Sequence, residues 1–309
     1  MNFRFEIFYG VKERIIVSRK RDWIIGLGVV LGTIILIILL VSYISQKQAY
    51  KGVRLSSRGD KIAVIELYGP IYDSRQIVRQ FKQFGDHRSV KAIVFRIESP
   101  GGGVAAAQEI YEAVKRVRVS GKPVVASMGT VAASGGYYVA CGADTIMANP
   151  GTTTGSIGVI AEVSNLKGLF DKLGIKFEVI KSGRFKDTGS PHRDLTPADR
   201  KILQSWVDDA FGQFIDVVIN ERGLSRRKVL QLADGRVFTG KQAQEHGLID
   251  LLGDYEDAIR LAAELGGIEG EPTIVKEHRR RITLFDLLFQ QIEGVLRGLG
   301  GITLRYSLF

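Results

Sequence analysis

The chain has 309 residues, a formal net charge of +10 and one cysteine, Cys141. This length is sufficient for a membrane anchor with one large domain or two smaller ones, and a lone cysteine excludes an intrachain disulfide. Positive charge gathers at residues 1–22 and from residue 276 onward, each with six Lys/Arg against three Asp/Glu, a net +3. Both ends flank apolar stretches, and no basic stripe with interleaved aromatic residues occurs. This pattern favours an anionic bilayer surface as partner and argues against nucleic acid.

An uncharged apolar run from Trp23 to Ile44 follows the short basic N-terminal segment. A run of about 22 residues can cross the hydrocarbon core of a bilayer as a helix. A globular helix is not apolar on every face over this length, and no small-x-small cleavage site follows, so we expect a transmembrane anchor and not a cleaved signal peptide. Within about 15 residues of the run, five positive charges precede it and four follow it. This bias predicts a single-pass protein of the cell membrane with a cytoplasmic N-terminus and an extracytoplasmic C-terminal domain.

Beyond a polar linker at residues 45–60, short apolar runs alternate with helical patterns, which is typical of an α/β domain. Strands are predicted at residues 62–67, 90–97, 123–128, 145–148, 159–163 and 176–180. Helices are predicted at residues 74–84 and 104–119, and a third begins at Ser134. A fourth helix begins at Pro197, with Thr196 as its N-cap, and ends at about residue 221. The domain is expected to span residues 61–270, and no internal duplication of residues 99–186 is visible.

Residues 271–309 form a basic C-terminal tail. Apolar side chains between Leu284 and Leu296 recur on one face of a possible helix behind the triplet Arg279-Arg280-Arg281. This amphipathic face is compatible with a helix lying on a membrane surface and equally with a segment that packs on a neighbouring copy. The sequence leaves both alternatives open.

Ser134 is the first candidate for chemistry. It lies in the segment Ala132-Ala133-Ser134-Gly135-Gly136-Tyr137-Tyr138, between a predicted strand and a predicted helix. A nucleophilic serine needs a nearby base and backbone N–H groups directed at the developing negative charge. Glycines after the serine allow a substrate backbone to approach, and the helix N-terminus favours an oxyanion. A Ser-Gly-Gly run also occurs where a helix packs tightly on a strand, so the run alone does not identify a nucleophile.

The run Gly101-Gly102-Gly103 strengthens the candidate site. It follows a predicted strand and precedes a predicted helix, where N–H groups can be left free to bind a carbonyl oxygen or an anion. The Gly-Lys-Ser/Thr ending of a phosphate-binding loop is absent, and the spaced glycine of the dinucleotide-binding pattern is missing. A purely structural turn is the alternative.

A base for Ser134 is not evident among the histidines. His87, His192, His246 and His278 lie among polar or charged residues, which is typical of solvated positions. Lysine can take the role only where desolvation lowers its pKa from about 10.4 toward neutrality, at a cost of about 4 kcal/mol. Lys186, in Ser182-Gly183-Arg184-Phe185-Lys186, is the candidate, although a surface position is the ordinary alternative for a lysine.

These segments together resemble the signal peptide peptidase SppA family, which are membrane-bound Ser–Lys proteases with the Clp/crotonase fold. The matching motifs are Ser99-Pro100-Gly101-Gly102-Gly103, Ala133-Ser134-Gly135-Gly136-Tyr137-Tyr138, Gly155-Ser156-Ile157-Gly158-Val159, Ser182-Gly183-Arg184-Phe185-Lys186 and Asp234-Gly235-Arg236-Val237-Phe238-Thr239-Gly240. The resemblance covers residues 61 to 265 and implies an α/β domain of ββα superhelical units behind one transmembrane helix.

The resemblance also implies roles for single residues. Ser134 is then the nucleophile, Lys186 the general base and Ser156 the residue that orients the lysine, while the N–H groups of Gly101 or Gly102 and of Gly135 form the oxyanion hole. No metal and no cofactor are implied.

This chain is similar to the short, single-copy members of that family. They assemble into a ring-shaped homo-oligomer, such as an octamer, in which adjacent protomers share the dyad. The implied substrates are remnant signal peptides and other hydrophobic peptides.

Other functions compete with this interpretation. A Clp-type Ser-His-Asp triad would need a histidine about 25 residues after the serine on this fold, and none is present near Val159. A crotonase-like acyl-CoA enzyme would use the glycine-rich oxyanion hole without a nucleophile, which the anchor and Ser134 argue against. An inactive or regulatory membrane scaffold is the third alternative, because a motif alone does not prove an assembled site.

Overall fold

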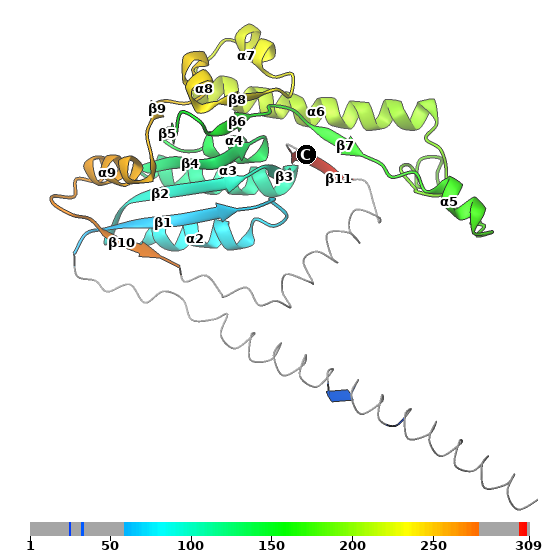
Figure 1. Ribbon diagram of the computed structural model, residues 1–309, viewed down its shortest axis with the longest axis horizontal. Helices are drawn as coiled ribbons and strands as arrows, with labels where there is room; N and C mark the ends of the chain where they lie inside the picture. The colour runs from blue at the N-terminus through cyan, green and yellow to red at the C-terminus, as the bar shows by residue number, and fades with distance from the viewer. Residues whose placement is uncertain (1–24, 26–31, 34–58, 278–302, 308–309) are drawn as a thin grey trace, which may run out of the picture. The chain divides into compact units, whose positions relative to one another are not determined.

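The computed structural model describes residues 25, 32–33, 59–277 and 303–307 (Figure 1). The chain divides into two compact units, residues 1–53 and 54–309, and the α/β domain belongs to the second unit. The predicted anchor Trp23–Ile44 lies outside the described residues except for Ile25, Gly32 and Thr33. In the part of the chain that is described, no helix combines the length and apolarity that crossing a membrane requires.

The described strands are β1 (Lys61–Tyr68), β2 (Val90–Ser99), β3 (Gly101–Gly103), β4 (Val124–Ala133), β5 (Thr145–Ala148), β6 (Thr153–Gly155), β7 (Ile160–Glu162), β8 (Val237–Thr239), β9 (Leu251–Leu252), β10 (Thr273–Lys276) and β11 (Thr303–Ser307). The described helices are α2 (Arg75–Asp86), α3 (Val104–Val119), α4 (Gly135–Ala140), α5 (Lys167–Lys172), α6 (Pro197–Arg222), α7 (Arg226–Leu232), α8 (Gly240–His246) and α9 (Tyr255–Leu265). The mixed α/β class is therefore as predicted.

The main sheet has the order β10-β1-β2-β4-β5-β9, and every pair along this path is parallel. At the end of β4, β6 adds in parallel and carries β8 as its antiparallel neighbour. A second, antiparallel sheet has the order β3-β11-β7. β10 and β11 both come from the segment 271–309, and the predicted helical face of that tail, from Leu284 to Leu296, lies outside the described residues.

Helices cover both faces of the main sheet (Figure 1). Ile62 and Val64 of β1 belong to a cluster with α9, whereas Ala63 and Ile65 belong to the larger core with α2, α3 and α4. Successive side chains of a strand point to opposite faces, so a parallel strand buried on both sides is a continuous apolar run. This is why Lys61–Tyr68 contains no period-two alternation of polar and apolar residues.

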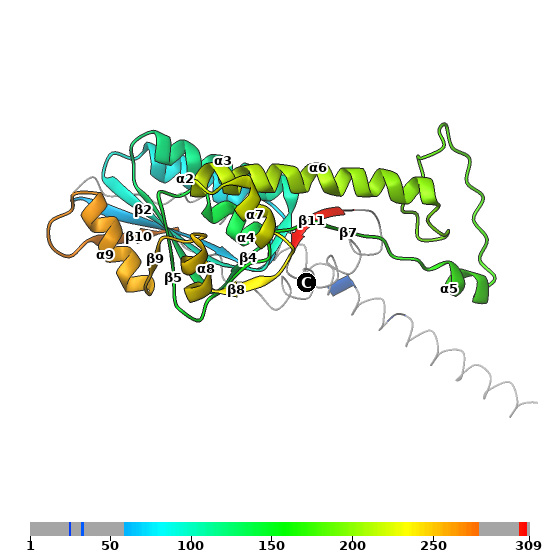
Figure 2. The same ribbon diagram turned by 90° about the horizontal axis from the view of Figure 1, so that it is seen from above.

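Helix α6 begins as the sequence predicts. Thr196 and Asp199 form a capping box, in which the hydroxyl oxygen of Thr196 accepts from the Asp199 N–H at 3.1 Å, and Pro197 occupies the first turn. The helix ends at Gly223, which has the left-handed conformation (φ 61°). The long helix connects the sheet region to an extended arm, defined here as residues 163–196 (Figure 2).

The predicted strand at residues 176–180 is wrong. These residues have no regular structure and lie in the arm. The side chain of Ile180 is fully exposed and that of Phe177 is about half exposed, so among the described residues this apolar run has no partner strand and no buried core. An apolar run forms a strand only where a neighbouring edge satisfies its backbone groups.

Candidate active site

Ser134 occupies the sharp turn between β4 and α4. Its backbone has φ 53° and ψ −116°, a conformation that residues other than glycine rarely adopt. The side chain is buried, and its Oγ has no hydrogen-bond partner among the described residues. Strain of this kind persists only where the surroundings enforce it, and it concentrates at functional sites. A buried hydroxyl without a partner is a second sign that this position serves chemistry and not stability.

The predicted oxyanion glycines lie against the turn of Ser134. A β-carbon at Gly101 would lie 2.7 Å from the backbone nitrogen of Gly135, so only glycine at position 101, with φ 101°, permits this approach. The N–H of Gly101 donates to Ser99 Oγ at 3.2 Å. The carbonyl of Gly101 and the N–H of Gly103 face Ile71, at 2.8 and 2.7 Å.

Gly102 is the better donor of the two alternatives. Backbone groups of successive residues in a strand point in opposite directions, so the N–H of Gly102 faces away from Ile71 and toward β11. The N–H of Gly101 is already used by Ser99. The geometry therefore favours Gly102 together with Gly135 for binding a carbonyl oxygen.

Ser156 lies beside the same turn. The N–H of Ser134 donates to the carbonyl oxygen of Gly155 at 2.7 Å, and the N–H of Ser156 donates to the carbonyl oxygen of Arg236 at 2.8 Å. Ser156 is buried and has φ 49°, a second positive-φ serine in this small region. The strand pair β6–β8 thus holds Ser156 next to Ser134, and Arg236 comes from the motif Asp234–Gly240 singled out in the sequence.

Lys186 is the one predicted catalytic residue that the protomer does not bring to this cluster. It lies in the arm between α5 and α6, and its side chain is exposed. Both views show the arm extending beyond the end of the main sheet (Figures 1 and 2). Since Ser134 Oγ has no hydrogen-bond partner in the described part of the chain, Lys186 does not hydrogen-bond to this serine within one protomer.

An ion-pair network fixes the loop of Lys186 onto α6. The neighbouring Asp187 accepts from Lys181 at 2.7 Å and from Arg193 at 3.0 Å, and Arg193 also pairs with Asp199 at 2.7 Å. Hydrogen bonds from Arg193 and Lys181 lower the pKa of Asp187 to about 2. Hydrogen bonds from Arg193 and Thr188 lower the pKa of Asp199 well below its usual range. The exposed loop is thus held by charged contacts and not by apolar burial.

None of the described histidines hydrogen-bonds to Ser134. His87 interacts with Ser89, His192 with Ser190 at 2.8 Å, and His246 packs against the ring of Phe238. His278 lies outside the described residues. Because Ser134 Oγ has no hydrogen-bond partner among the described residues, the geometry argues against a histidine base within that part of the protomer.

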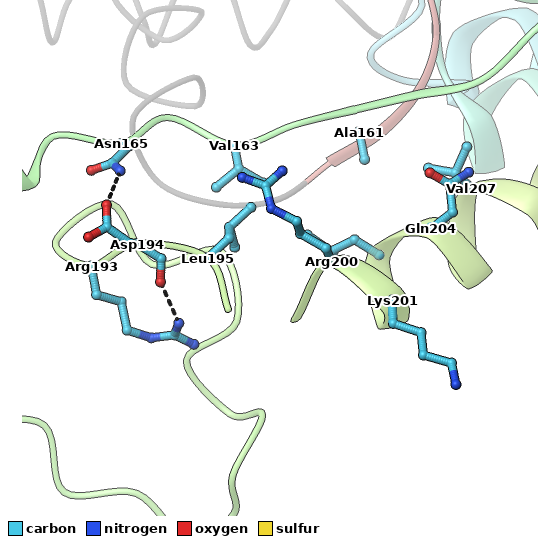
Figure 3. Close-up of a pocket in the computed structure, with 11 residues that line it drawn as sticks. Ala161, Val163, Asn165, Arg193, Asp194, Leu195, Arg200, Lys201, Gln204 and Val207 are labelled. Atoms are coloured by element: carbon cyan, nitrogen blue, oxygen red, sulfur yellow. Dashed lines mark hydrogen bonds between the residues drawn. The ribbon is translucent and has the colours of Figure 1, made fainter. Parts of the chain in front are cut away.

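A cavity of about 710 Å³ lies near the base of the arm (Figure 3). Its lining comes from three segments, the end of β7, the loop before α6 and the first turns of α6. The lining residues are Ala161, Val163, Asn165, Arg193, Asp194, Leu195, Arg200, Lys201, Leu203, Gln204 and Val207. Hydrogen bonds from Asn165 to Asp194 and from Arg193 to the Asp194 carbonyl shape one wall.

Strand β11 is the part of the site that sequence reasoning missed. It pairs Tyr306 with Gly102 and Ser307 with Gly101, directly on the glycine loop. Tyr306 is fully buried although it is close to the last residue of the sequence, Phe309. A single strand of five residues in a basic tail carries no signal of its own, because its partners are remote in sequence.

Comparison with known proteins identifies the family. The model of peptidase family S49 matches residues 116–269, and the Clp protease model matches residues 47–154. A putative protease of Synechocystis is 47% identical over 215 residues, which cover 69% of this chain and 77% of the relative. The chain belongs to peptidase family S49.

Two further relatives extend this assignment. A putative protease of Methanocaldococcus jannaschii is 31% identical over 79% of this chain and 83% of its own length. A putative signal peptide peptidase SppA of Enterococcus faecium is 38% identical over 61% of this chain and 55% of its own length. The S49 chain is therefore a serine protease with a Clp-like domain, and its resemblance to the SppA family is confirmed.

Proposed function

We propose that this S49 protease is a membrane-anchored endopeptidase in which Ser134 is the nucleophile and Lys186 the general base. Ser156 orients the lysine, and the N–H groups of Gly102 and Gly135 hold the oxyanion. The observation that carries the proposal is Ser134 itself, a strained and buried serine with an unpartnered Oγ among the described residues, at the N-terminus of a helix and beside a glycine loop.

The chemical steps follow from these positions. Ser134 Oγ attacks the carbonyl carbon of the peptide bond while its proton passes to Lys186 Nζ, and the carbonyl oxygen becomes the oxyanion. The C–N bond then breaks, the amine leaves with the proton held by the lysine, and an ester on Ser134 remains. Water attacks this ester, with Lys186 again accepting a proton, and releases the carboxylic acid and the free serine.

The lysine comes from an adjacent copy in this proposal. Lys186 lies on an arm whose apolar side chains are exposed in the protomer, among them Leu173, Phe177 and Ile180. An arm of this kind is expected to be covered in a homo-oligomer, and burial against a neighbour would desolvate the ammonium group. A ring, such as an octamer, places every arm on the next protomer by the same interface.

The substrates that fit are signal peptides left in the bilayer and similar hydrophobic peptides. Support comes from the apolar run Trp23–Ile44, which would anchor the domain to the membrane, with the N-terminus cytoplasmic and the protease domain extracytoplasmic. A relative described as a putative signal peptide peptidase SppA agrees with this substrate class.

Labelling with a fluorophosphonate probe tests the dyad. The full chain is purified in detergent and compared with Ser134→Ala, Lys186→Ala, and alanine variants of His87, His192, His246 and His278. Labelling disappears in the first two variants and persists in all four histidine variants. Loss in one histidine variant, with retention in Lys186→Ala, assigns the base to that histidine. Activity should also rise into the alkaline range as the base deprotonates, whereas a bell-shaped profile centred near pH 6 contradicts a lysine base.

Mixed assemblies test the shared dyad. Ser134→Ala and Lys186→Ala chains are inactive alone, but a ring assembled from both in equal amounts contains intact sites. About a quarter of the interfaces then join an intact serine to an intact lysine, so about a quarter of the activity returns. A mixture that stays inactive, in rings shown by mass to contain both chains, places serine and lysine in one protomer.

A further inference from the structure

The pairing of β2 with β4 becomes irregular near the end of both strands. The two strands lie side by side and run parallel (Figure 1). Ile97 pairs with Met128, but Ser99 pairs with Ala132, so two steps along β2 correspond to four steps along β4. Residues 129–131 thus lie opposite a single residue of β2, as in a β-bulge. Bulges change the direction of the chain that follows them and are frequent next to active sites.

The residue of β2 opposite this bulge is Glu98, and its carboxylate binds two backbone N–H groups of the bulge. One oxygen accepts from the Thr130 N–H at 2.8 Å, and the other accepts from the Val131 N–H at 3.0 Å. Hydrogen bonds from N–H groups to a carboxylate are stronger than those to a neutral acceptor. A β-carbon at Gly129 would overlap the carboxylate, so a larger residue there would displace Glu98 from this position.

Two hydroxyl groups hold carbonyl groups of the same stretch of β4. Thr152 Oγ1 donates to the carbonyl oxygen of Gly129, and Thr154 Oγ1 donates to that of Ala132, each at 2.7 Å. Both threonines are buried, and they lie immediately before β6 and within it. The bulge is therefore fixed by a side chain of β2 and by two side chains of the β6 segment.

Ser134 follows the bulge in the chain and depends on its position. The strained backbone of Ser134, with φ 53°, persists only where the surroundings enforce it. Val131 lies shortly before Ser134 on the same strand, so a shift of the bulge along β4 would move the serine Oγ as well. A displacement of about 1 Å at a reacting group can lower a rate about 100-fold.

We propose that Glu98 is a positioning residue for the nucleophile. By holding the N–H groups of Thr130 and Val131, it keeps Ser134 in the strained conformation that catalysis requires. The inference rests on the proposed function of Ser134. Glu98 acts through the backbone of β4, because its two carboxylate oxygens each accept from that strand. A side chain that only stabilised the sheet would change the unfolding temperature and leave the reactivity of the folded serine unchanged.

Labelling kinetics separate positioning from stability. The full chain is labelled with a fluorophosphonate at a temperature at which every variant is folded, and the rate at saturating probe and the half-saturating concentration are both measured. Glu98→Ala should lower the saturating rate about 100-fold and leave the half-saturating concentration within about two-fold, because the misplaced group is the nucleophile. An unchanged saturating rate in folded Glu98→Ala overturns the inference.

Asp144→Ala is the matched control. The Asp144 carboxylate also accepts from a backbone N–H of β4, that of Val124 at 2.8 Å, but at the beginning of the strand and not beside the bulge. Its loss should lower the unfolding temperature and leave the saturating labelling rate of the folded protein unchanged. A loss of labelling rate as large as that in Glu98→Ala would show that any weakening of β4 has this effect, and would contradict the role given to Glu98.

Glu98→Gln keeps the size of the side chain and one accepting oxygen. Its amide NH2 would face the second N–H group, so only one of the two hydrogen bonds can form. The saturating labelling rate should fall at least about five-fold and lie between those of the wild type and Glu98→Ala. If Glu98→Ala does not fold, this variant decides alone, and a wild-type labelling rate in Glu98→Gln overturns the inference.

Melting temperatures test the same role without catalysis. Glycine tolerates positive φ, so Ser134→Gly should melt at a higher temperature than Ser134→Ala. Without the Glu98 carboxylate the bulge can relax, so this gap should shrink to less than half in a Glu98→Gln background and persist in an Asp144→Ala background. Equal gaps in both backgrounds overturn the positioning role. Absent labelling of the wild type refutes the proposed function, whereas normal labelling of the wild type and of Glu98→Gln refutes only the inference.

Discussion

The amide N–H of Ser134 donates a hydrogen bond of 2.7 Å to the carbonyl oxygen of Gly155. This one contact joins the turn after β4 to the turn after β6, and it places the two positive-φ serines, 134 and 156, side by side. The pairing of Ala133 with Gly155 sets the register, so neither serine can shift without breaking the end of the sheet.

The backbone strain at Ser134 predicts that glycine at this position gives a more stable protein than alanine does. Glycine adopts φ 53° without the steric cost that alanine or serine bears. Ser134→Gly should therefore be more stable than Ser134→Ala by about 1–2 kcal/mol, while both variants are inactive. Thermal unfolding of the two inactive variants measures the difference. Equal melting temperatures would show that the surroundings impose no strain at this residue.

Gly101 should not tolerate alanine. A β-carbon there would lie 2.7 Å from the Gly135 nitrogen and 2.0 Å from the Tyr306 oxygen, so the two glycines of the proposed oxyanion hole must move apart. We expect Gly101→Ala to reduce fluorophosphonate labelling by about 100-fold or more, the usual effect of a damaged oxyanion hole. Gly121→Ala is the matched control, because Gly121 also has positive φ (86°) but has open space around it. Similar losses of labelling in Gly101→Ala and Gly121→Ala would show that backbone strain alone causes the effect.

Acid should release the arm that carries Lys186. Ion pairing lowers the pKa of Asp187 to about 2, below the value near 4 of an unfolded chain. A lowered folded-state pKa stabilises the paired form fully above about pH 4, and this stabilisation is lost as the pH falls toward 2. Pepsin cleavage between residues 173 and 196, divided at each pH by pepsin cleavage of an unfolded peptide, should thus accelerate from pH 4 to pH 2.

A variant of the same network removes this pH dependence. Asp199→Asn breaks the ion pair with Arg193, so the normalised cleavage rate of the arm at pH 4 should approach that of the wild type at pH 2. Asp216→Asn is the control. Asp216 lies on α6, as Asp199 does, and forms an exposed ion pair with Arg226 of α7. Exposed ion pairs contribute little to stability, so this variant should be cleaved like the wild type. Identical cleavage profiles for both variants would contradict the role given to Asp199.

Cys141 should be unreactive in the folded protein. Burial raises the pKa of its thiol to about 12, and the thiolate is the reactive form. Iodoacetamide at pH 8 should leave the native chain unmodified and alkylate one cysteine after unfolding in guanidinium chloride. Alkylation of the native chain at the rate of the unfolded chain would show that α4, and with it the turn of Ser134, opens readily.

Much of the α/β pattern could be predicted from local sequence. Val104–Val119 and Thr145–Ala148 have the predicted bounds, and the N-cap Thr196 with Pro197 begins α6 as expected. Apolar periodicity and capping chemistry are local properties, so neighbouring residues suffice to indicate them. The strand predicted at residues 176–180 is wrong for the same reason, because a local pattern cannot show that these apolar residues have no partner edge in the described part of the chain.

The sequence by itself determined the candidate residues for the chemistry of this S49 protease. Ser134 and the glycines could be named because nucleophiles, tight turns and close backbone approach each demand a particular residue type, whereas Ser156 and Lys186 were named through the resemblance of their motifs to a known family. Only the tertiary structure decided that Gly102 pairs with Tyr306 of β11, and that Ser134 Oγ has no hydrogen bond to Lys186 within the described part of one protomer. These relations depend on strand pairing between segments up to about two hundred residues apart, for which no local residue pattern exists.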